Sequence, residues 1–250
     1  MQVIDIPRVQ LPEYPEPPTT ETYLGISHEY IYQMALSIGT DAGFSFTHDN
    51  IKISHEGKRC FMVLYFKHPS VEEPFMVAAR SCYDKSASVA LASGMYVLCC
   101  ANLCISGGDM TIVRKHTLNA LSDLGQLSLS MTKSAMSRFF RMRVFQKDIQ
   151  NYKLEDDQGK MIIGAALGKG IINHGTFLTA MKHWKEPPYK EFVEEKNLWG
   201  VYNALTYGCH KLTLNNQIPT NAAITEYIKQ INENIKFIRL FPPKKNHIVF

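Results

Sequence analysis

The sequence predicts an α+β fold, in which a twisted antiparallel sheet is covered by a long helix and followed by a smaller helical subdomain. Apolar residues alternate with polar ones through much of residues 44–115, which is the pattern of strands. After His116 the apolar period changes to about three and a half residues, which is the pattern of a helix. A hydrophobic content of 45% in 250 residues supports a packed core.

The chain begins with a segment that differs from the rest. Five prolines within residues 1–22 exclude a regular helix there and predict an extended arm. From Ser27, a residue type that caps helices, apolar residues recur at helical spacing and predict a helix that stops at Gly39.

A series of short apolar runs predicts the sheet. Alternation at Phe44 and Phe46, and again at Ile51 and Ile53, indicates the first strands, and the pair at 56–57 indicates a hairpin turn. Further strands are predicted at residues 60–66, 75–81, 86–92, 96–105 and 110–115. This order predicts a meandering antiparallel sheet.

One long helix after His116 is expected to lie across that sheet. Its apolar face is predicted from residues at helical spacing, namely Leu118, Leu121, Leu124, Leu127 or Ser128, Met131, Ala135, Phe139 and Met142. Four further helices are predicted at 161–168, 173–184, 190–209 and 220–236. The predicted organisation is an arm at 1–22, one α+β domain at 23–236 with its sheet core in 23–150 and its helical part in 160–236, and a tail at 237–250.

Composition indicates a soluble intracellular protein without a membrane partner. No apolar run approaches the ~20 residues that a membrane span needs, and the start of the chain lacks the layout of a signal peptide. The six cysteines are not spaced as a disulfide framework, which fits a reducing compartment. The net charge of +4 is modest, but its distribution is uneven, with acids in excess over residues 1–60.

A polar turn at 83–86, an Asn-centred segment at 100–102 and a basic triplet at 114–116 follow one another within residues 79–117. This order resembles the core of a family of phage, prophage and plasmid proteins known as domain of unknown function 932. The matching residues are Tyr83, Asp84, Ser86, Cys100, Asn102 and Gly107, with His116 at the end of the region. Lys85 and Leu103 stand where the family has glycines, which permit positive φ at no steric cost.

A second stretch, 197–206, is similar to the family's Leu-Trp-x-x-x-Asn-Ala-x-Thr segment through Trp199, Asn203 and Thr206, so the likeness covers roughly residues 23–210. The order of helix, strands and long basic helix also resembles, more loosely, the single-strand annealing proteins that phages carry. The resemblance implies a phage or plasmid protein in the cytosol of a bacterial host. At helical spacing Trp199, Tyr202 and Asn203 share a face, for which a structural role is favoured.

Residues 164–170 invite comparison with a phosphate-binding loop. The segment is one residue short of that motif, and Gly170 stands where a hydroxyl group would hold magnesium. Closely packed small residues on a helix explain the pattern equally well, and no cofactor is expected.

Two side-chain groups suggest other chemistry. Cys99, Cys100, Cys104 and His116 are ligand types for zinc, but adjacent strand residues point to opposite faces, so buried thiols are favoured and no metal is expected. Asp84 with Tyr83 and Ser86, and His116 as a base, could form a catalytic cluster. An Asp two residues before a Ser is also the pattern of a turn that satisfies its own backbone amides, and this interpretation is favoured.

The strongest functional signal is the basic segment at 133–147, which contains no acid. Arg138 and Arg141 lie three residues apart, and Arg143 and Lys147 four apart, so each pair shares a helical face. Aromatic neighbours such as Phe139, Phe140 and Phe145 could stack bases or pack inward. A solvated outer face of the helix accounts for the pattern as well. The candidate nucleic-acid-binding residues are Arg114, Lys115, Lys133, Arg138, Arg141, Arg143 and Lys147.

Together these observations predict a nucleic-acid-binding protein of a phage or plasmid. It is expected to bind single-stranded DNA in replication or recombination, as a monomer or a homo-oligomer, without chemistry of its own. The alternative is a host-interaction protein of a mobile element that engages a bacterial defence system, docking through the Pro-rich arm and the apolar segment at 237–250.

Overall fold

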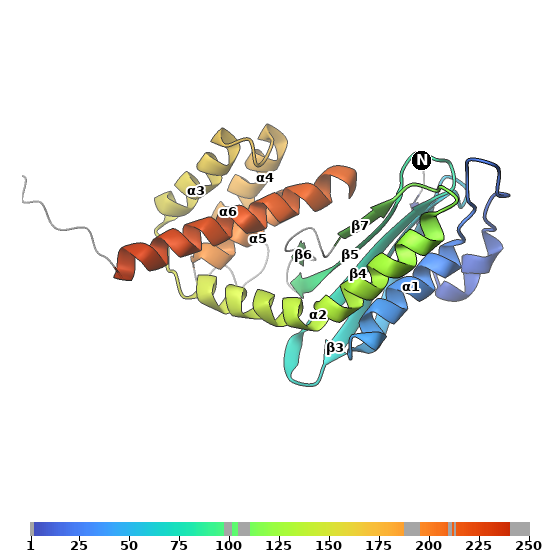
Figure 1. The fold of residues 1–250 in the computed structure, drawn as a ribbon. Helices are drawn as coiled ribbons and strands as arrows, with labels where there is room; N and C mark the ends of the chain where they lie inside the picture. The colour runs from blue at the N-terminus through green and yellow to red at the C-terminus, as the bar shows by residue number, and fades with distance from the viewer. Residues whose placement is uncertain are drawn as a thin grey trace, which may run out of the picture. The chain divides into compact units, whose positions relative to one another are not determined.

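The computed structural model describes residues 3–97, 102–104, 111–187, 196–209, 212 and 214–240. The chain divides into two compact units, Met1–Met142 and Arg143–Phe250 (Figure 1). The first unit contains an antiparallel sheet with helices, and the described part of the second is helical apart from one isolated β-bridge. The predicted α+β class is therefore confirmed.

The sheet of the first unit is a meander with one branch. Its strands are β1 Val3–Ile6, β2 Ser45–Ser54, β3 Arg59–His68, β4 Val71–Cys82, β5 Val89–Val97, β6 Asn102–Cys104 and β7 Thr111–Arg114. All pairs are antiparallel in the order β1-β2-β3-β4-β5-β6, and β7 pairs with the first half of β5. Two predicted strands, 86–92 and part of 96–105, are one strand, β5, because Gly94 stays in the ladder opposite Met76.

The N-terminal segment, expected as an extended arm, is in part built into the sheet. Residues 3–6 contain no proline, so their N–H groups can join the ladder, and β1 pairs with β2 from Val3 opposite Ser54 to Ile6 opposite Ile51. A 3-10 helix, η1, follows at Arg8–Glu13 and buries Leu11.

Helix α1, His28–Asp41, is capped as predicted: the Ser27 hydroxyl oxygen accepts a hydrogen bond from the Tyr30 N–H at 3.1 Å. The helix continues past Gly39. The Phe66 ring packs where a side chain at this position would stand, since a Cβ added to Gly39 would lie 2.2 Å from the ring. Tyr32 donates a hydrogen bond to Asp49 at 2.6 Å. These contacts place α1 on the sheet face that carries Phe66.

Helix α2 spans Ala120–Gln150, and its first-unit part, up to Met142, lies with α1 in front of the sheet in Figure 1. The predicted apolar face is confirmed for Leu124, Met131, Ala135, Phe139 and Met142, which are buried. Phe139 packs edge-on against Phe44 and Phe75, on the same face of the sheet as α1. The prediction was wrong for Leu118 and Leu121, which are 56% and 38% exposed. Leu118 precedes the helix, which begins at Ala120, and Leu121 lies on the exposed side of the first turn, whereas Ala120 and Leu124 are buried.

The second unit contains helices α3 Asp156–Gly168, α4 His174–Lys185, α5 Leu198–Gly208 and α6 Leu214–Leu240. α3 starts five residues before its predicted position, because Glu155 and Gln158 form a reciprocal cap. α5 is buried along nearly its whole length between α4 and α6. α6 is longer than predicted and includes Pro219. Among the described residues, no helix has the length and apolar character to cross a membrane.

Candidate nucleic-acid interface

The turn at 83–86 is held by the carboxylate of Asp84. Its Oδ1 accepts a hydrogen bond from the Ser86 N–H at 3.0 Å, and its Oδ2 pairs with Arg59 Nε at 2.6 Å. Burial alone would raise the pKa of Asp84, but the hydrogen bonds from Ser86 and Arg59 lower it to about 2. Lys85 adopts a positive φ of 59°. Both carboxylate oxygens are therefore used in building the turn.

Tyr83 is buried against His28, the first residue of α1. The two rings stack with centroids 3.8 Å apart, and the His28 N–H donates to the Tyr83 hydroxyl oxygen at 2.8 Å. The hydroxyl donates in turn to the Tyr14 carbonyl at 3.3 Å. Nε2 of His28 lies 2.8 Å from the Gly57 carbonyl, which can only accept, so this nitrogen carries the proton. The pKa of His28 is lowered to about 4, chiefly by burial and to a smaller extent by the nearby His116, although the hydrogen bond to the Gly57 carbonyl raises it.

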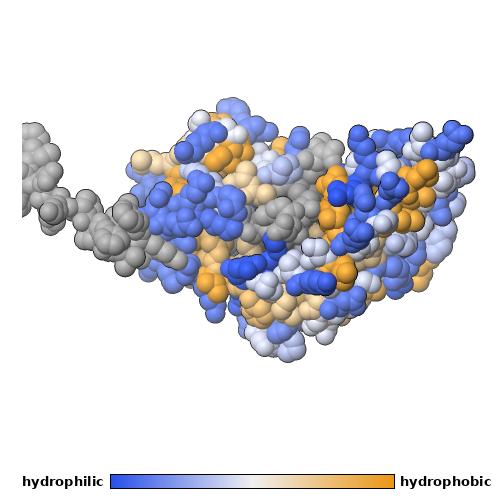
Figure 2. All heavy atoms as spheres, viewed as in Figure 1, coloured by the Kyte–Doolittle hydropathy of each residue, from blue (hydrophilic) through white to orange (hydrophobic). Residues whose placement is uncertain are grey.

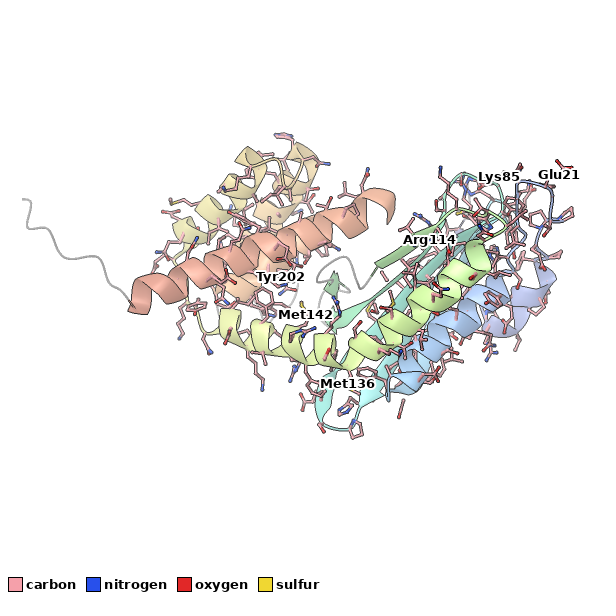
Figure 3. All side chains as sticks on the ribbon, viewed as in Figure 1. Glu21, Lys85, Arg114, Met136, Met142 and Tyr202 are labelled. Carbon is pink, nitrogen blue, oxygen red and sulfur yellow. The ribbon has the colours of Figure 1, made fainter. Side chains whose placement is uncertain are left out.

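His116 lies at the same end of the sheet, but its hydrogen bond is structural. Nδ1 of His116 donates to the Leu24 carbonyl at 3.1 Å, and its ring stacks on Tyr23 with centroids 5.0 Å apart. The ammonium group of Lys85 lies 4.9 Å from the centre of the Tyr23 ring (Figure 3). Within the described residues, no hydrogen bond links His116 to Asp84 or Ser86. The geometry favours the structural interpretation of this cluster over the catalytic one.

A pocket of about 390 Å³ opens beside Tyr83. Three carboxylates and one ammonium group line it, together with backbone and proline; the charged residues are Glu13, Glu56, Asp84 and Lys58. An excess of negative charge repels phosphate, so this pocket does not suit nucleic acid.

The other predicted sites fall as follows. Residues 164–168 are helical, in the last turns of α3, so they do not form a phosphate-binding loop. Cys99, Cys100 and Gly107 lie outside the described residues, as do the side chains of Asn102 and Cys104 in β6. Within the described part of the chain, no three metal-ligating side chains gather in a way that could hold an ion.

Trp199, Asn203 and Thr206 belong to the core of the second unit. The Asn203 amide donates to the Trp199 carbonyl at 2.8 Å, and the Thr206 hydroxyl donates to the Tyr202 carbonyl at 3.0 Å. The Trp199 ring stacks on Tyr202 at 5.2 Å. These bonds support the structural role that was favoured for this segment.

In the first unit, the basic residues of α2 differ in exposure. Lys133 and Arg141 are exposed, whereas Arg138 is half-buried. Of the aromatic neighbours, Phe139 is buried, but Phe140 is 37% exposed, with its ring edge-on to His68 at 5.3 Å. Figure 2 shows hydrophilic residues beside hydrophobic ones along α2.

The remaining basic candidates differ in what they contact. In the second unit, Lys147 is exposed, and the half-buried Arg143 donates to Gln146 Oε1 at 3.4 Å. In the first unit, Lys115 is exposed, but Arg114 pairs with Asp123 of α2 at 3.4 Å and donates to the Val113 carbonyl at 2.7 Å (Figure 3). Sequence reasoning could not separate the exposed cations from the engaged ones, because the separation depends on how α2 is rotated against the sheet.

Sequence reasoning also did not find His28, Tyr14 or Arg59, the partners of the 83–86 turn. They come from distant segments, and their spacing carries no local signal. The chain matches no family model, no curated protein and no solved structure. The resemblance to the domain of unknown function 932 therefore stays a prediction.

Proposed function

We propose that this chain binds single-stranded nucleic acid, with DNA as the favoured form, as a phage or plasmid protein of replication or recombination. The observation that carries the proposal is the exposed face of α2 in the first unit, where two cations, Lys133 and Arg141, lie on the same side of the helix as the ring of Phe140. At ~100° per residue, Phe140 lies about 20° to one side of Lys133 and Arg141 about 80° to the other side. These three side chains thus share one side of the helix and are exposed.

This arrangement suits a single strand for two reasons. Phosphates attract cations, and within the described part of the chain no carboxylate pairs with Lys133 or Arg141. Residues 126–147 contain no acid. An exposed aromatic ring can stack on the face of an unpaired base. In a duplex the faces of the bases are covered by neighbouring base pairs. Since Asp84 and His116 are both held in structural hydrogen bonds, binding without chemistry of its own is the function that this geometry supports best.

The alternative, docking on a host protein, draws less support from the structure. The N-terminal segment that was expected to dock is partly paired in the sheet as β1. The end of the chain, at 241–250, lies outside the described residues. This function stays a second prediction.

The test is fluorescence anisotropy with a labelled oligothymidine over a range of salt concentrations. The double variant Lys133→Gln and Arg141→Gln should bind more weakly, and its log-log salt slope should be smaller by about 1.4, at ~0.7 for each phosphate contact on a single strand. Absence of binding by the unmodified chain at low salt would overturn the proposal.

A matched control removes two cations at the other end of the sheet. Lys58 and Lys85 are exposed and lie near the start of β3, whereas Phe140 contacts His68 at its end, about 30 Å away at ~3.3 Å per residue. Replacing Lys58 and Lys85 by Gln should change the slope much less. Equal losses in both double variants would assign the effect to net charge and count against an α2 interface.

A further inference from the structure

The sheet of the first unit has a second face, opposite to the helices. Side chains alternate between the two faces of a strand, so the register defines which residues share a face. Three cross-strand rows of β2, β3 and β4 lie on this outer sheet face: His48, Tyr65 and Met76; Asn50, Val63 and Ala78; Lys52, Phe61 and Arg80. These nine residues define the surface discussed here.

Both α-helices of this unit lie on the other face. α1 packs on Phe66 through Gly39, and α2 packs on Phe75 through Phe139. Phe66 and Phe75 are partners in the ladder and belong to the face opposite Tyr65 and Met76. The outer sheet face is therefore separate from the α2 surface described above.

The outer sheet face combines rings with positive charge. The His48 and Tyr65 rings stack with centroids 4.3 Å apart and planes 7° apart, and His48 is exposed. Phe61 and Tyr65 flank a small apolar cluster of Val63, Met76 and Ala78 and are only partly buried.

Its charged residues are of one sign. Lys52 is exposed, and Arg80, which donates hydrogen bonds to the Ser88 carbonyl at 3.2 and 3.1 Å, is half-buried. The nine residues include no carboxylate; the residue that stands beside Lys52 on β1 is Asp5. Rings that stack bases, set among cations, are the features by which proteins hold single strands without reading sequence.

We propose that the outer sheet face is a base-stacking surface for single-stranded nucleic acid, in which Phe61 and the Tyr65–His48 pair contact bases and Lys52 contacts phosphate. This inference rests on the proposed function and adds to it a second surface, in which rings outnumber the exposed cations. Phe61 and Tyr65 are four residues apart on β3, about 13 Å at ~3.3 Å per residue, so each ring takes its own base. A protein partner would need apolar area, but Val63, Met76 and Ala78 are already buried.

The experiment compares an oligothymidine with an abasic oligomer of the same length and charge. The unmodified chain should bind the oligothymidine more tightly. The double variant Phe61→Leu and Tyr65→Leu keeps apolar side chains but removes the rings, so it should bind oligothymidine about 5- to 150-fold more weakly for each ring lost. It should lose most of the preference over the abasic oligomer, because only the Phe140 ring on α2 is left to stack. Its salt slope should stay unchanged, because no cation is removed.

The matched control is Phe46→Leu. Phe46 is 39% exposed, but it pairs with Phe66 and belongs to the helix-covered face. This variant should keep the full preference for oligothymidine. A double variant that retains the preference of the unmodified chain would overturn the inference and leave the α2 interface standing. A chain that binds neither oligomer would overturn the proposed function and, with it, this inference.

Photocrosslinking of the unmodified chain to an oligomer that contains bromodeoxyuridine gives a readout that does not depend on folding of a variant. Crosslinks in peptides from β2 and β3 are expected. Crosslinks confined to α2 would contradict the stacking surface even if the double variant failed to fold.

Discussion

The imidazole ring of His28 lies flat on the phenol ring of Tyr83, with ring planes only 3° apart. This contact joins the first residue of α1 to the turn that follows β4, across 55 residues of sequence. The side chain is fully buried, and its Nδ1 has no hydrogen-bond partner among the described residues. A proton on this nitrogen would leave a buried charge without compensation, so the fold holds His28 neutral.

The first prediction concerns the pH dependence of the first unit. Burial lowers the pKa of His28 to about 4, from 6.5 in an unfolded chain, so the unfolded state binds more protons between these values. The free energy of unfolding should therefore fall as pH drops from about 6.5 to 4, by up to about 3.4 kcal/mol at 1.36 kcal/mol per pKa unit, and then level off. The pKa of His116, lowered by burial, acts in the same direction.

Hydrogen exchange under mild denaturant, followed by mass spectrometry of peptides from α1 and β3, measures this unit alone. Tryptophan fluorescence would not, since both tryptophans, Trp184 and Trp199, lie in the second unit. The slope with pH should decrease in His28→Gln and stay unchanged in His174→Gln, where the histidine is exposed. An equal slope in His28→Gln would mean that His28 does not titrate in this way.

The second prediction separates a structural from a catalytic role for Asp84. Asn keeps the side-chain oxygen that accepts from the Ser86 N–H and loses only the partly exposed pair with Arg59, which is worth about 1 kcal/mol or less. Asp84→Ala loses both and should be less stable than Asp84→Asn. Oligonucleotide binding should be the same in both variants under conditions where they are folded. Loss of binding in a folded Asp84→Asn would place this carboxylate in a functional site.

The third prediction tests the hairpin at Gly57. Gly57 has a φ of 84°, and an added Cβ would lie 2.0 Å from the Tyr14 ring. Gly57→Ala should lower the free energy of unfolding of the first unit by roughly 1–3 kcal/mol, because it adds backbone strain and a steric overlap. Gly125→Ala is the opposite case: this residue lies in α2 with nothing within 4 Å of an added Cβ, so the variant should gain about 0.5–1 kcal/mol. Similar effects in the two variants would contradict the described contact with Tyr14.

The class of fold could be predicted from the sequence because the two spacings of apolar residues, two for the strands and about three and a half for the long helix, are both clear. The strand expected at 60–66 is β3, and the predicted apolar residues of α2 from Leu124 to Met142, namely Leu124, Met131, Ala135, Phe139 and Met142, are buried. The edge strand β1 could not be predicted, because residues 3–6 become a strand only by pairing with β2 and their own composition does not indicate it.

The sequence likewise identified the basic residues, but it did not predict which of them contact a carboxylate or a carbonyl in the folded chain. Lys133 and Arg114 are alike in sequence terms, yet among the residues that the structure describes only Arg114 of the two has a carboxylate partner, Asp123 on a different element. The stacked pair of His48 and Tyr65 depends on a register across two strands with a bulge, which no local pattern fixes.

The fourth prediction uses that difference between the cations. Arg114 is paired with Asp123 and bonded to the Val113 carbonyl, so its charge is partly neutralised before any phosphate arrives. Arg114→Gln should therefore reduce the salt slope for oligothymidine by clearly less than the ~0.7 expected for Arg141→Gln. Asp123→Asn should have the opposite effect and tighten binding, because it removes a negative charge beside α2 and releases Arg114. Asp41→Asn, an exposed acid at the end of α1, is the control for net charge. If Asp123→Asn tightened binding no more than Asp41→Asn does, Arg114 would lie outside the path of the strand, and the interface would be confined to the middle of α2.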